Sequence, residues 1–194
     1  MTSLRHNTAQ DGYLDAARAC ILDVGWRRTT LTEVARRAGV SRMTIYRTWS
    51  DMQQLLGDLM TREWGDVVAA AVDADPGTDP LDRIVGQITG TVRALRDNEL
   101  FVRIVELDPE LLLPYLLARR GRSQQAILDL AEAEIAAAQK AGRVRPGSPA
   151  AMARGLVLAA HGFVLSAHTM VDDGASLEDL DEELSRLLAG SLAP

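Results

Sequence analysis

Residues 30–49, TLTEVARRAGVSRMTIYRTW, decide how this sequence is expected to fold. Thr30 is placed to cap a first short helix, with Glu33 three residues later completing a capping box, and Ser41 is placed to cap a second helix. Gly39 lies between the two, where a sharp turn needs a positive φ that glycine adopts without steric cost. Two short helices joined by a tight glycine-containing turn form the helix-turn-helix pattern. A generic helical hairpin is the alternative.

The apolar residues of this stretch are expected to clamp the first helix over the second. They are Val34, Ala35, Ala38, Val40 and Ile45. The opposite face of the second helix is then free to enter the major groove of DNA, with its N-terminal residues nearest the base edges. The side chains predicted to face the groove are Arg42, Met43, Thr44, Tyr46 and Arg47.

These residue types suit contact with DNA. An arginine can bind guanine through two hydrogen bonds, hydroxyl groups can bind phosphates, and a methyl group can contact the methyl of thymine. Thr29 and Thr32, around the first turn of the first helix, are predicted phosphate contacts through side chain and backbone N–H. Tyr46 as a core aromatic is the alternative, but Ile45 and Trp49 already take the inward positions.

The distribution of charge agrees with a polyanionic partner for this end of the chain. The whole chain of 194 residues has a net charge of −6, but residues 1–64 carry nine arginines against seven acidic residues. Within 27–47 there are six arginines and a single acid, Glu33. Such a patch attracts a polyanion that the rest of the chain repels. On charge alone, a solvated charged face explains it equally well.

The remainder of the chain predicts an all-α fold of about nine helices. Seven prolines lie at the borders of periodic runs, and no alternating run is long enough for a strand. Residues 1–10 are expected to form a mobile polar arm. Ser50 and Gln53 are expected to form the capping box of the fourth helix. The later helices are predicted over about 80–96, 100–107, 109–141, 149–171 and from 177 onward.

Composition narrows the class of protein. Cys20 is the one cysteine, so an intrachain disulfide is excluded, and its place in an apolar stripe favours a small buried side chain over a redox sensor. The longest nearly apolar run, 155–167, is shorter than the ~20 residues that span a bilayer. We therefore expect a soluble, cytoplasmic protein. The sequence lacks the motifs of hydrolases, phosphate loops and zinc proteases, which predicts no enzyme activity, cofactor or metal.

The stretch resembles the TetR family of regulators. The family pattern is met over about residues 11–60 by Thr30, Val34, Ala35, Ala38, Gly39, Val40, Ser41, Thr44, Ile45, Tyr46, Trp49, Leu55 and Leu56. Two positions depart from it: Met43 stands where glycine is frequent, and Met52 where a phosphate-contacting lysine is common. The second departure is expected to shift that contact to Arg47, Ser50 and the N-terminus of the fourth helix.

The resemblance implies a three-helix DNA-binding domain over residues 1–52 and a helical effector-binding and dimerisation domain over 53–194. It implies a transcriptional regulator, a repressor released from a palindromic operator by a small hydrophobic effector. The apolar helix at 152–167 and the final leucine stripe would then form the homodimer interface, as the corresponding helices do in the family. The stripe consists of Leu177, Leu180, Leu184, Leu187 and Leu188. The alternative is an all-helical ligand- or protein-binding module that binds no specific DNA.

The same resemblance places an effector pocket in the middle of the chain. The predicted lining residues are Ile88, Val92, Phe101, Ile104, Val105, Leu112, Tyr115, Leu116, His161 and Phe163. His161 and His168 are seven residues apart and so share a helix face, which could hold a metal or ligand. Without a third ligand at a suitable spacing, a pocket or core histidine is the preferred interpretation.

Overall fold

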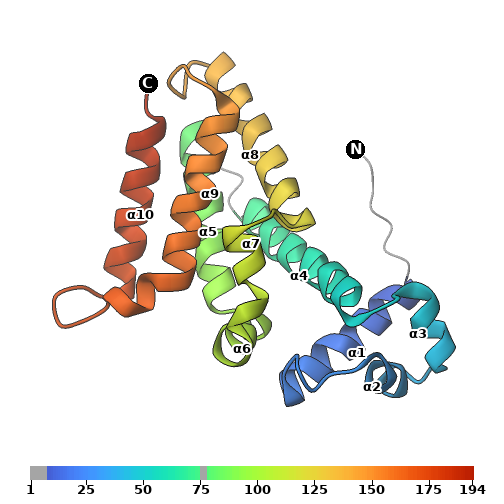
Figure 1. Ribbon diagram of the computed structural model, residues 1–194. Helices are drawn as coiled ribbons and strands as arrows, with labels where there is room; N and C mark the ends of the chain where they lie inside the picture. Colours follow the sequence, from blue (N-terminus) through green and yellow to red (C-terminus); the bar gives the residue numbers. More distant parts are fainter. Residues whose placement is uncertain (1–7, 75–77) are drawn as a thin grey trace. The chain divides into compact units, whose positions relative to one another are not determined.

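The computed structural model describes residues 8–74 and 78–194, and over these residues the protein is entirely helical apart from turns and one isolated bridge between Asp172 and Ala175 (Figure 1). The α-helices are α1 (Thr8–Val24), α2 (Leu31–Arg37), α3 (Arg42–Thr48), α4 (Met52–Ala74), α5 (Pro80–Arg96), α6 (Glu99–Leu107), α7 (Leu113–Leu117), α8 (Arg122–Lys140), α9 (Pro149–Ser166) and α10 (Leu177–Leu192). Short 3-10 turns cover Pro109–Leu111 and Ala167–Met170. The predicted all-α class is confirmed.

The chain forms two compact units. The first contains residues 1–63 and 98–122, and the second contains 64–97 and 123–194. The first unit is therefore discontinuous in sequence, because α6 contributes Leu100 and Ile104 to the same apolar core as α1–α4. The predicted boundary between residues 52 and 53 does not coincide with this division. As a boundary between functions it stays a prediction.

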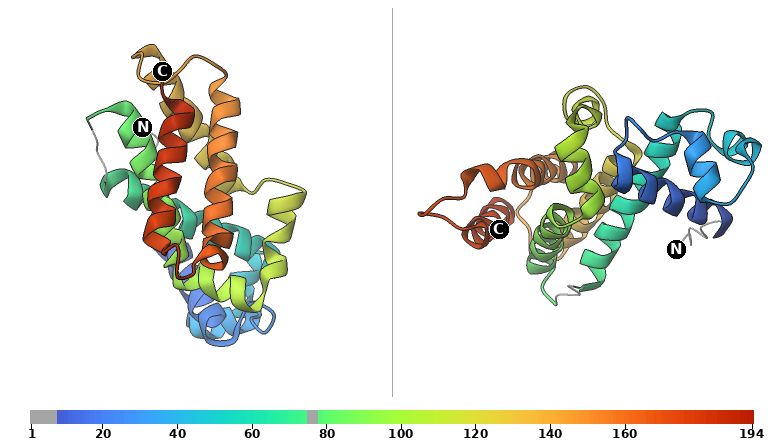
Figure 2. Two further views of the ribbon diagram at one scale, coloured as in Figure 1. Left: turned by 90° about the vertical axis from the view of Figure 1, so that its left-hand side faces the viewer. Right: turned by 90° about the horizontal axis from the view of Figure 1, so that it is seen from below.

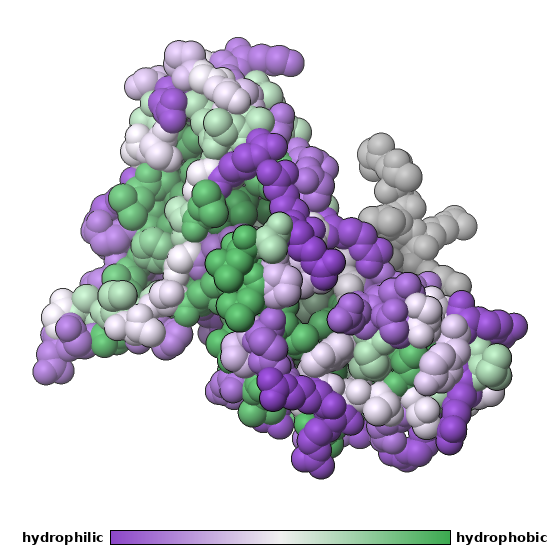
Figure 3. Space-filling model, viewed as in Figure 1, coloured by the Kyte–Doolittle hydropathy of each residue, from purple (hydrophilic) through white to green (hydrophobic). Residues whose placement is uncertain are grey.

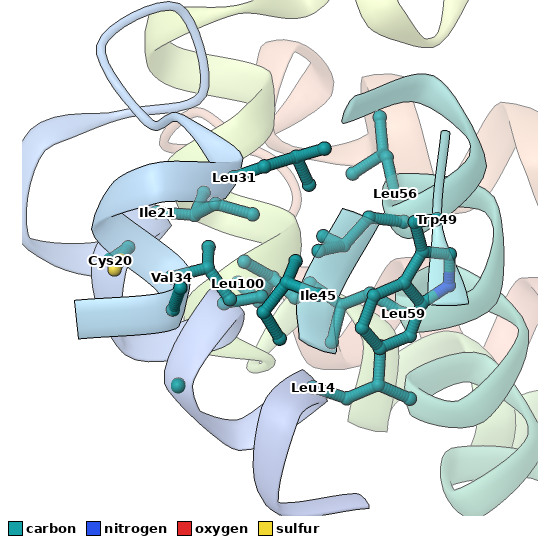
Figure 4. Close-up of a cluster of buried hydrophobic side chains, with 14 of the residues drawn as sticks. Leu14, Cys20, Ile21, Leu31, Val34, Ile45, Trp49, Leu56, Leu59 and Leu100 are labelled. Atoms are coloured by element: carbon teal, nitrogen blue, oxygen red, sulfur yellow. The ribbon is translucent and has the colours of Figure 1, made fainter. Parts of the chain in front are cut away.

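The first unit is held by one apolar cluster that brings α1, α2, α3, α4 and α6 together (Figure 4). Trp49 is fully buried in it, and its indole N–H donates a 2.7 Å hydrogen bond to the Asp58 carboxylate. Tyr13 packs edge-on against the same indole, with ring centroids 6.4 Å apart. Leu100 and Ile104 of α6 are also fully buried here, so α6 is part of the core of this unit.

In the second unit, α5, α9 and α10 pack on one another (Figure 2). Leu184, Leu188 and Leu192 of α10 are buried at their contact. Asp181, also buried, accepts hydrogen bonds from Arg93 (2.8 Å) and Arg96 (2.5 Å) of α5. Two arginines on one buried carboxylate fix the register of α10 against α5. A shift of α10 would separate Asp181 from these arginines and leave its buried charge without a partner.

The predicted N-caps of α2 and α3 are confirmed, and the predicted cap of α4 is wrong. The capping box predicted for α2 is only half formed, because the Glu33 carboxylate binds Arg36 instead of the backbone N–H of Thr30. Thr30 and Ser41 accept from the backbone N–H groups of Glu33 and Thr44, both at 3.2 Å, and Gly39 has φ +68°. At α4 the capping residue is Asp51, whose carboxylate accepts from the N–H of Gln54 at 2.9 Å. The predicted Ser50–Gln53 pair is therefore displaced by one residue, because an ionised carboxylate accepts a stronger hydrogen bond from a backbone N–H than a hydroxyl does.

Two other predictions of secondary structure are corrected. The predicted mobile arm at 1–10 extends too far, because α1 begins at Thr8; residues 1–7 lie outside the described part of the chain. The single helix predicted over 109–141 is broken into a 3-10 turn, α7 and α8. Pro114 lacks a backbone N–H and occupies the first turn of α7, and residues 118–121 separate α7 from α8, so one continuous helix cannot form.

The segment Pro149–Met170 is long and apolar enough to cross a membrane by length and composition alone, because the helix extends beyond the shorter apolar run at 155–167. Only 28% of its most apolar window is buried within the chain. Core helices of soluble proteins meet the same criterion. The observation that matters for this fold is that much of an apolar helix remains uncovered by its own chain.

Candidate nucleic-acid interface and ligand cavity

The structure packs α2 and α3 as the sequence predicts. Val34, Ala35 and Ile45 are buried with at most 1% of their surface exposed, and Ile45 belongs to the same core cluster as Trp49. The N–H of Val40 donates to the carbonyl of Ala35 at 3.0 Å and closes the turn at Gly39. Because Ile45 and Trp49 point inward, the remaining positions of α3 are left on its outer face.

That outer face carries the predicted groove-facing side chains. Met43 is 68% exposed and Tyr46 47% exposed, so Tyr46 is not a core aromatic. Arg42 and Arg47 are also exposed, and neither guanidinium has a hydrogen bond or ion pair with any described residue. Thr44 is half-buried, and its hydroxyl shares a 2.9 Å hydrogen bond with that of Ser41. The structure thus places these five residues together on one short helix.

Several neighbouring arginines are neutralised within the first unit. Arg36 pairs with Glu33 at 2.6 Å and Arg37 pairs with Asp23. The hydrogen bond from Arg36 lowers the pKa of Glu33, so that pair stays ionised. Arg27 binds Glu110 at 2.5 Å. Among the arginines of 27–47 and within the described residues, Arg28, Arg42 and Arg47 are left without a carboxylate partner.

The two threonines predicted as phosphate contacts differ in their surroundings. Thr29 is buried; its hydroxyl donates to the carbonyl of Gly25 at 2.8 Å, and its N–H donates to that of Trp26 at 3.0 Å. Both donors are thus used in closing the α1–α2 turn, and we do not retain Thr29 as a DNA contact. Thr32 is half-buried in the first turn of α2, with its hydroxyl unbonded to any described residue.

The N-terminus of α4 is also unsuited to the phosphate contact expected there. The Asp51 carboxylate occupies that end, accepting from the N–H of Gln54 and from the Ser50 hydroxyl at 3.1 Å. The backbone hydrogen bond from Gln54 lowers the pKa of Asp51, so a negative charge stands where a phosphate would bind. Of the groups expected to replace the lysine missing at Met52, only the Arg47 guanidinium is exposed and without a partner among the described residues.

A hydrogen bond that joins the end of α6 to the α1–α2 turn could not be predicted from the sequence. Asp108, only 2% exposed, accepts a 2.9 Å hydrogen bond from the N–H of Trp26 and lies 3.5 Å from the Arg27 guanidinium. Gly25 has φ +82°, and a Cβ there would come within 3.3 Å of Leu107. The available signal was the dipeptide Asp108–Pro109, which indicates a helix border and says nothing about burial.

The second unit contains a cavity of about 120 Å³. It is lined by Val68, Val72, Ile84, Gln87, Ile88, Thr91, Val92, Leu95, Ile127, Leu130, Ala131, Glu134, Leu156, Val157, Ala160, His161 and Val164. These residues come from α4, α5, α8 and α9. Most of them are apolar, which is usual for a small-molecule site.

Only Ile88, Val92 and His161 of the predicted pocket residues line this cavity. The predictions for Phe101, Ile104, Val105, Leu112, Tyr115 and Leu116 are not supported, because these residues belong to the first unit, where Ile104 is core. Phe163 is half-buried on α9 but outside the cavity wall. These side chains were predicted from their place in the middle of the chain, but α6 contributes to the core of the first unit.

The two histidines do not share a site. His161 lines the cavity, and burial lowers the pKa of its imidazole. His168 is exposed on the 3-10 turn that follows α9. Among the described residues no group of three potential metal ligands comes together. Cys20 is buried in the core of the first unit, as its place in an apolar stripe predicts.

An all-helical chain whose exposed α3 is clamped by α2 is a helix-turn-helix protein. Residues 14–59 match the family model described as "Bacterial regulatory proteins, tetR family". An uncharacterized HTH-type transcriptional regulator of Mycobacterium tuberculosis (strain ATCC 25618 / H37Rv) is 34% identical over 194 residues, covering 99% of this chain and 100% of the relative. The chain belongs to the TetR family and is a DNA-binding transcriptional regulator with a helical ligand-binding domain.

Solved structures share the fold over nearly the whole chain. The transcriptional repressor QsdR of R. erythropolis, from the TetR family, has a TM-score of 0.68 at 17% identity and covers 95% of each chain. SmeT in complex with triclosan has a TM-score of 0.65 at 21% identity, covering 97% of this chain and 93% of that one. At these identities the likeness shows the fold alone.

Proposed function

We propose that this regulator binds a palindromic operator as a homodimer and represses transcription until a small, mainly apolar effector enters the cavity of the second unit. It acts in the cytoplasm and has no enzyme activity. The observation that carries the proposal is the outer face of α3, where Arg42 and Arg47 stand exposed and, among the described residues, unpaired beside Met43, Thr44 and Tyr46.

For DNA binding, the contrast between paired and unpaired arginines supports the contact set Thr32, Arg42, Met43, Thr44, Tyr46 and Arg47. An arginine already bound to a carboxylate must give up that partner to bind phosphate, whereas Arg42 and Arg47 need give up only water. Residues near the N-terminus of a recognition helix are the ones that contact bases. Arg42 is therefore assigned to base recognition and Arg47 to the phosphate backbone.

For dimerisation, the uncovered apolar surface of α9 and α10 supports an interface through the last two helices. Leu158 of α9 is 70% exposed and Leu187 of α10 is 59% exposed. Figure 3 shows hydrophobic surface over the region of these helices. Leu187 belongs to the leucine stripe predicted for α10, yet it faces outward. A second copy of the same two helices would cover both leucines, and the resulting two-fold symmetry matches a palindromic site.

For regulation, chain connectivity supports a link between the cavity and the DNA-binding unit. The segment 98–122 packs with the first unit, and its ends continue directly into α5 and α8, which line the cavity. An occupant that shifts α5 or α8 pulls on this segment, which the Asp108–Trp26 hydrogen bond ties to the α1–α2 turn. An effector acts only by binding one of two states more tightly.

The test is selection of random duplex DNA by the purified full-length protein at about 150 mM salt, where the nonspecific electrostatic contribution to affinity is moderate. A retained palindromic motif supports dimeric operator binding. Retention without any motif, or no retention by folded protein, would instead favour a helical binding module, an alternative that the methionine at position 52 makes worth testing.

A further inference from the structure

The few polar groups of the cavity wall restrict what the cavity can hold. Four of its lining residues carry polar side chains: Gln87, Thr91, Glu134 and His161. Glu134 is paired with Arg83 at 2.8 Å, and the Thr91 hydroxyl donates to the backbone carbonyl of Gln87 at 2.8 Å. The imidazole of His161 and the side-chain amide of Gln87 have no hydrogen-bond partner within the described part of the chain.

These groups disfavour a charged occupant. The single charged side chain in the wall is an acid that already has its cation, and no cationic side chain from the described residues lines the cavity. Burial lowers the pKa of His161, so its imidazole is neutral near pH 7 and offers one N–H donor and one acceptor nitrogen. A carboxylate that exchanges water for contact with this apolar wall would gain no counter-ion there, which is unfavourable.

The size of the cavity sets a second limit. Its volume of about 120 Å³ is comparable with the apolar cavity of about 150 Å³ that, in an engineered protein, binds benzene. An occupant on the scale of one substituted ring therefore fits without moving the helices apart.

We propose that the cavity selects an uncharged, mainly apolar molecule of about one ring, whose single hydroxyl or carbonyl group is bound by the side chain of His161 or Gln87. Shape and apolar contact with α5, α8 and α9 supply most of the affinity. The hydrogen bond to His161 or Gln87 supplies the selectivity for an occupant that carries a hydroxyl or carbonyl group. This inference rests on the proposed function, because it names the class of effector for the same cavity.

The test compares three probes that differ in one group: toluene, p-cresol and benzoate. Each is titrated calorimetrically at pH 7.5 into the full-length protein, without DNA, and into the variants His161→Leu and His168→Leu. We expect p-cresol and toluene to bind and benzoate not to bind. His161→Leu should weaken p-cresol about two- to tenfold, the range for loss of one net hydrogen bond, while leaving toluene unchanged. His168→Leu, a matched change at an exposed histidine, should alter neither.

Binding of benzoate more tightly than p-cresol would overturn the inference, as would an equal loss of toluene and p-cresol in His161→Leu. Binding of none of the three at millimolar concentration would also overturn it. Because the titration contains no DNA, these results leave the proposed function standing. That proposal fails separately, if the same preparation selects no DNA motif. If His161→Leu leaves p-cresol binding unchanged or unfolds, Gln87→Leu should show the loss of about two- to tenfold for p-cresol and none for toluene; no selective loss of p-cresol in either folded variant would also overturn the inference.

Discussion

The backbone N–H of Trp26 donates a 2.9 Å hydrogen bond to the carboxylate of Asp108, a residue 82 positions further along the chain. The bond ties the turn that precedes α2 to the C-terminal end of α6. Arg27, next in sequence, lies near the same carboxylate and also binds Glu110.

Replacing Asp108 should weaken the first unit. In Asp108→Ala the Trp26 N–H loses its acceptor in a part-buried site, so we expect a loss of about 1–3 kcal/mol in the free energy of unfolding. Asp108→Asn keeps an acceptor oxygen and should lose less. Urea unfolding measures both. Glu110→Ala, which removes only the exposed partner of Arg27, is the control and should change stability little. Equal losses in the Asp108→Ala and Glu110→Ala variants would contradict a special role for the buried carboxylate.

Arg47 should contribute to DNA affinity through charge. If its guanidinium binds a phosphate, Arg47→Ala weakens all DNA sequences alike and reduces the slope of log affinity against log salt by about 1. Fluorescence anisotropy across a salt series measures this slope. Lys140→Ala, at the exposed end of α8, removes the same charge from the second unit and should leave the slope unchanged. An identical change of slope in both variants would refute the assignment.

Arg42 should affect which sequence is bound. At the first position of α3 it is exposed and unpaired among the described residues, so bidentate binding to guanine is open to it. Arg42→Ala should cost about 1–3 kcal/mol on the selected operator and relax the preference at one position of each half-site. Repeating the selection with the variant tests this. An unchanged motif with uniformly weaker binding would make Arg42 a phosphate contact.

A charge on the outer face of α9 or α10 should prevent dimerisation. Leu158→Glu and Leu187→Glu each place a carboxylate in the proposed interface, so we expect the sedimentation mass of a dimer to fall to that of one chain. Leu117→Glu is the matched control, since Leu117 is 79% exposed on α7, in the first unit. Sedimentation equilibrium at micromolar concentration decides between them. A wild-type mass equal to one chain would refute the interface.

His161 should make stability depend on pH in a defined direction. Its folded-state pKa is lower than its ordinary value of 6.5, so the unfolded chain binds a proton where the folded chain does not. The free energy of unfolding therefore falls as the pH is lowered through about 6.5, and this contribution stops changing below the folded-state pKa. His161→Gln should show a weaker pH dependence between about pH 7.5 and 5.5, a window that brackets the unfolded-state pKa. His168→Gln, at an exposed site, should follow the wild type.

The helix-turn-helix could be predicted because its determinants are local. The caps at Thr30 and Ser41, the left-handed Gly39 and the inward Ile45 all act within a few residues of one another, and each has a recognisable residue type. The error at α4 has the same origin, because two adjacent polar residues compete for one capping position. Asp51 prevails over Ser50, with consequences for phosphate binding at that helix end.

The cavity could not be predicted because it depends on which helices pack together. Phe101 and Ile104 have the apolar spacing of pocket residues, yet α6 packs into the core of the first unit, where Ile104 is buried. Gln87 and Thr91 lie on one face of α5 and line the cavity. Their place in the wall could not be predicted, because polar residues on a helix usually face solvent. Which arginines are paired likewise depends on how the helices pack, since Arg37 of α2 forms its ion pair with Asp23 of α1.

The discontinuous first unit has a consequence for engineering and for evolution. A DNA-binding specificity moved between relatives by exchanging only residues 8–63 would arrive without Leu100, Ile104 and Asp108, and its core would face foreign side chains. The first unit is built from two separated segments that share one core, so both have to be transferred together. We therefore expect functional chimaeras to require co-transfer of 98–122, and recombination within α5 to be poorly tolerated.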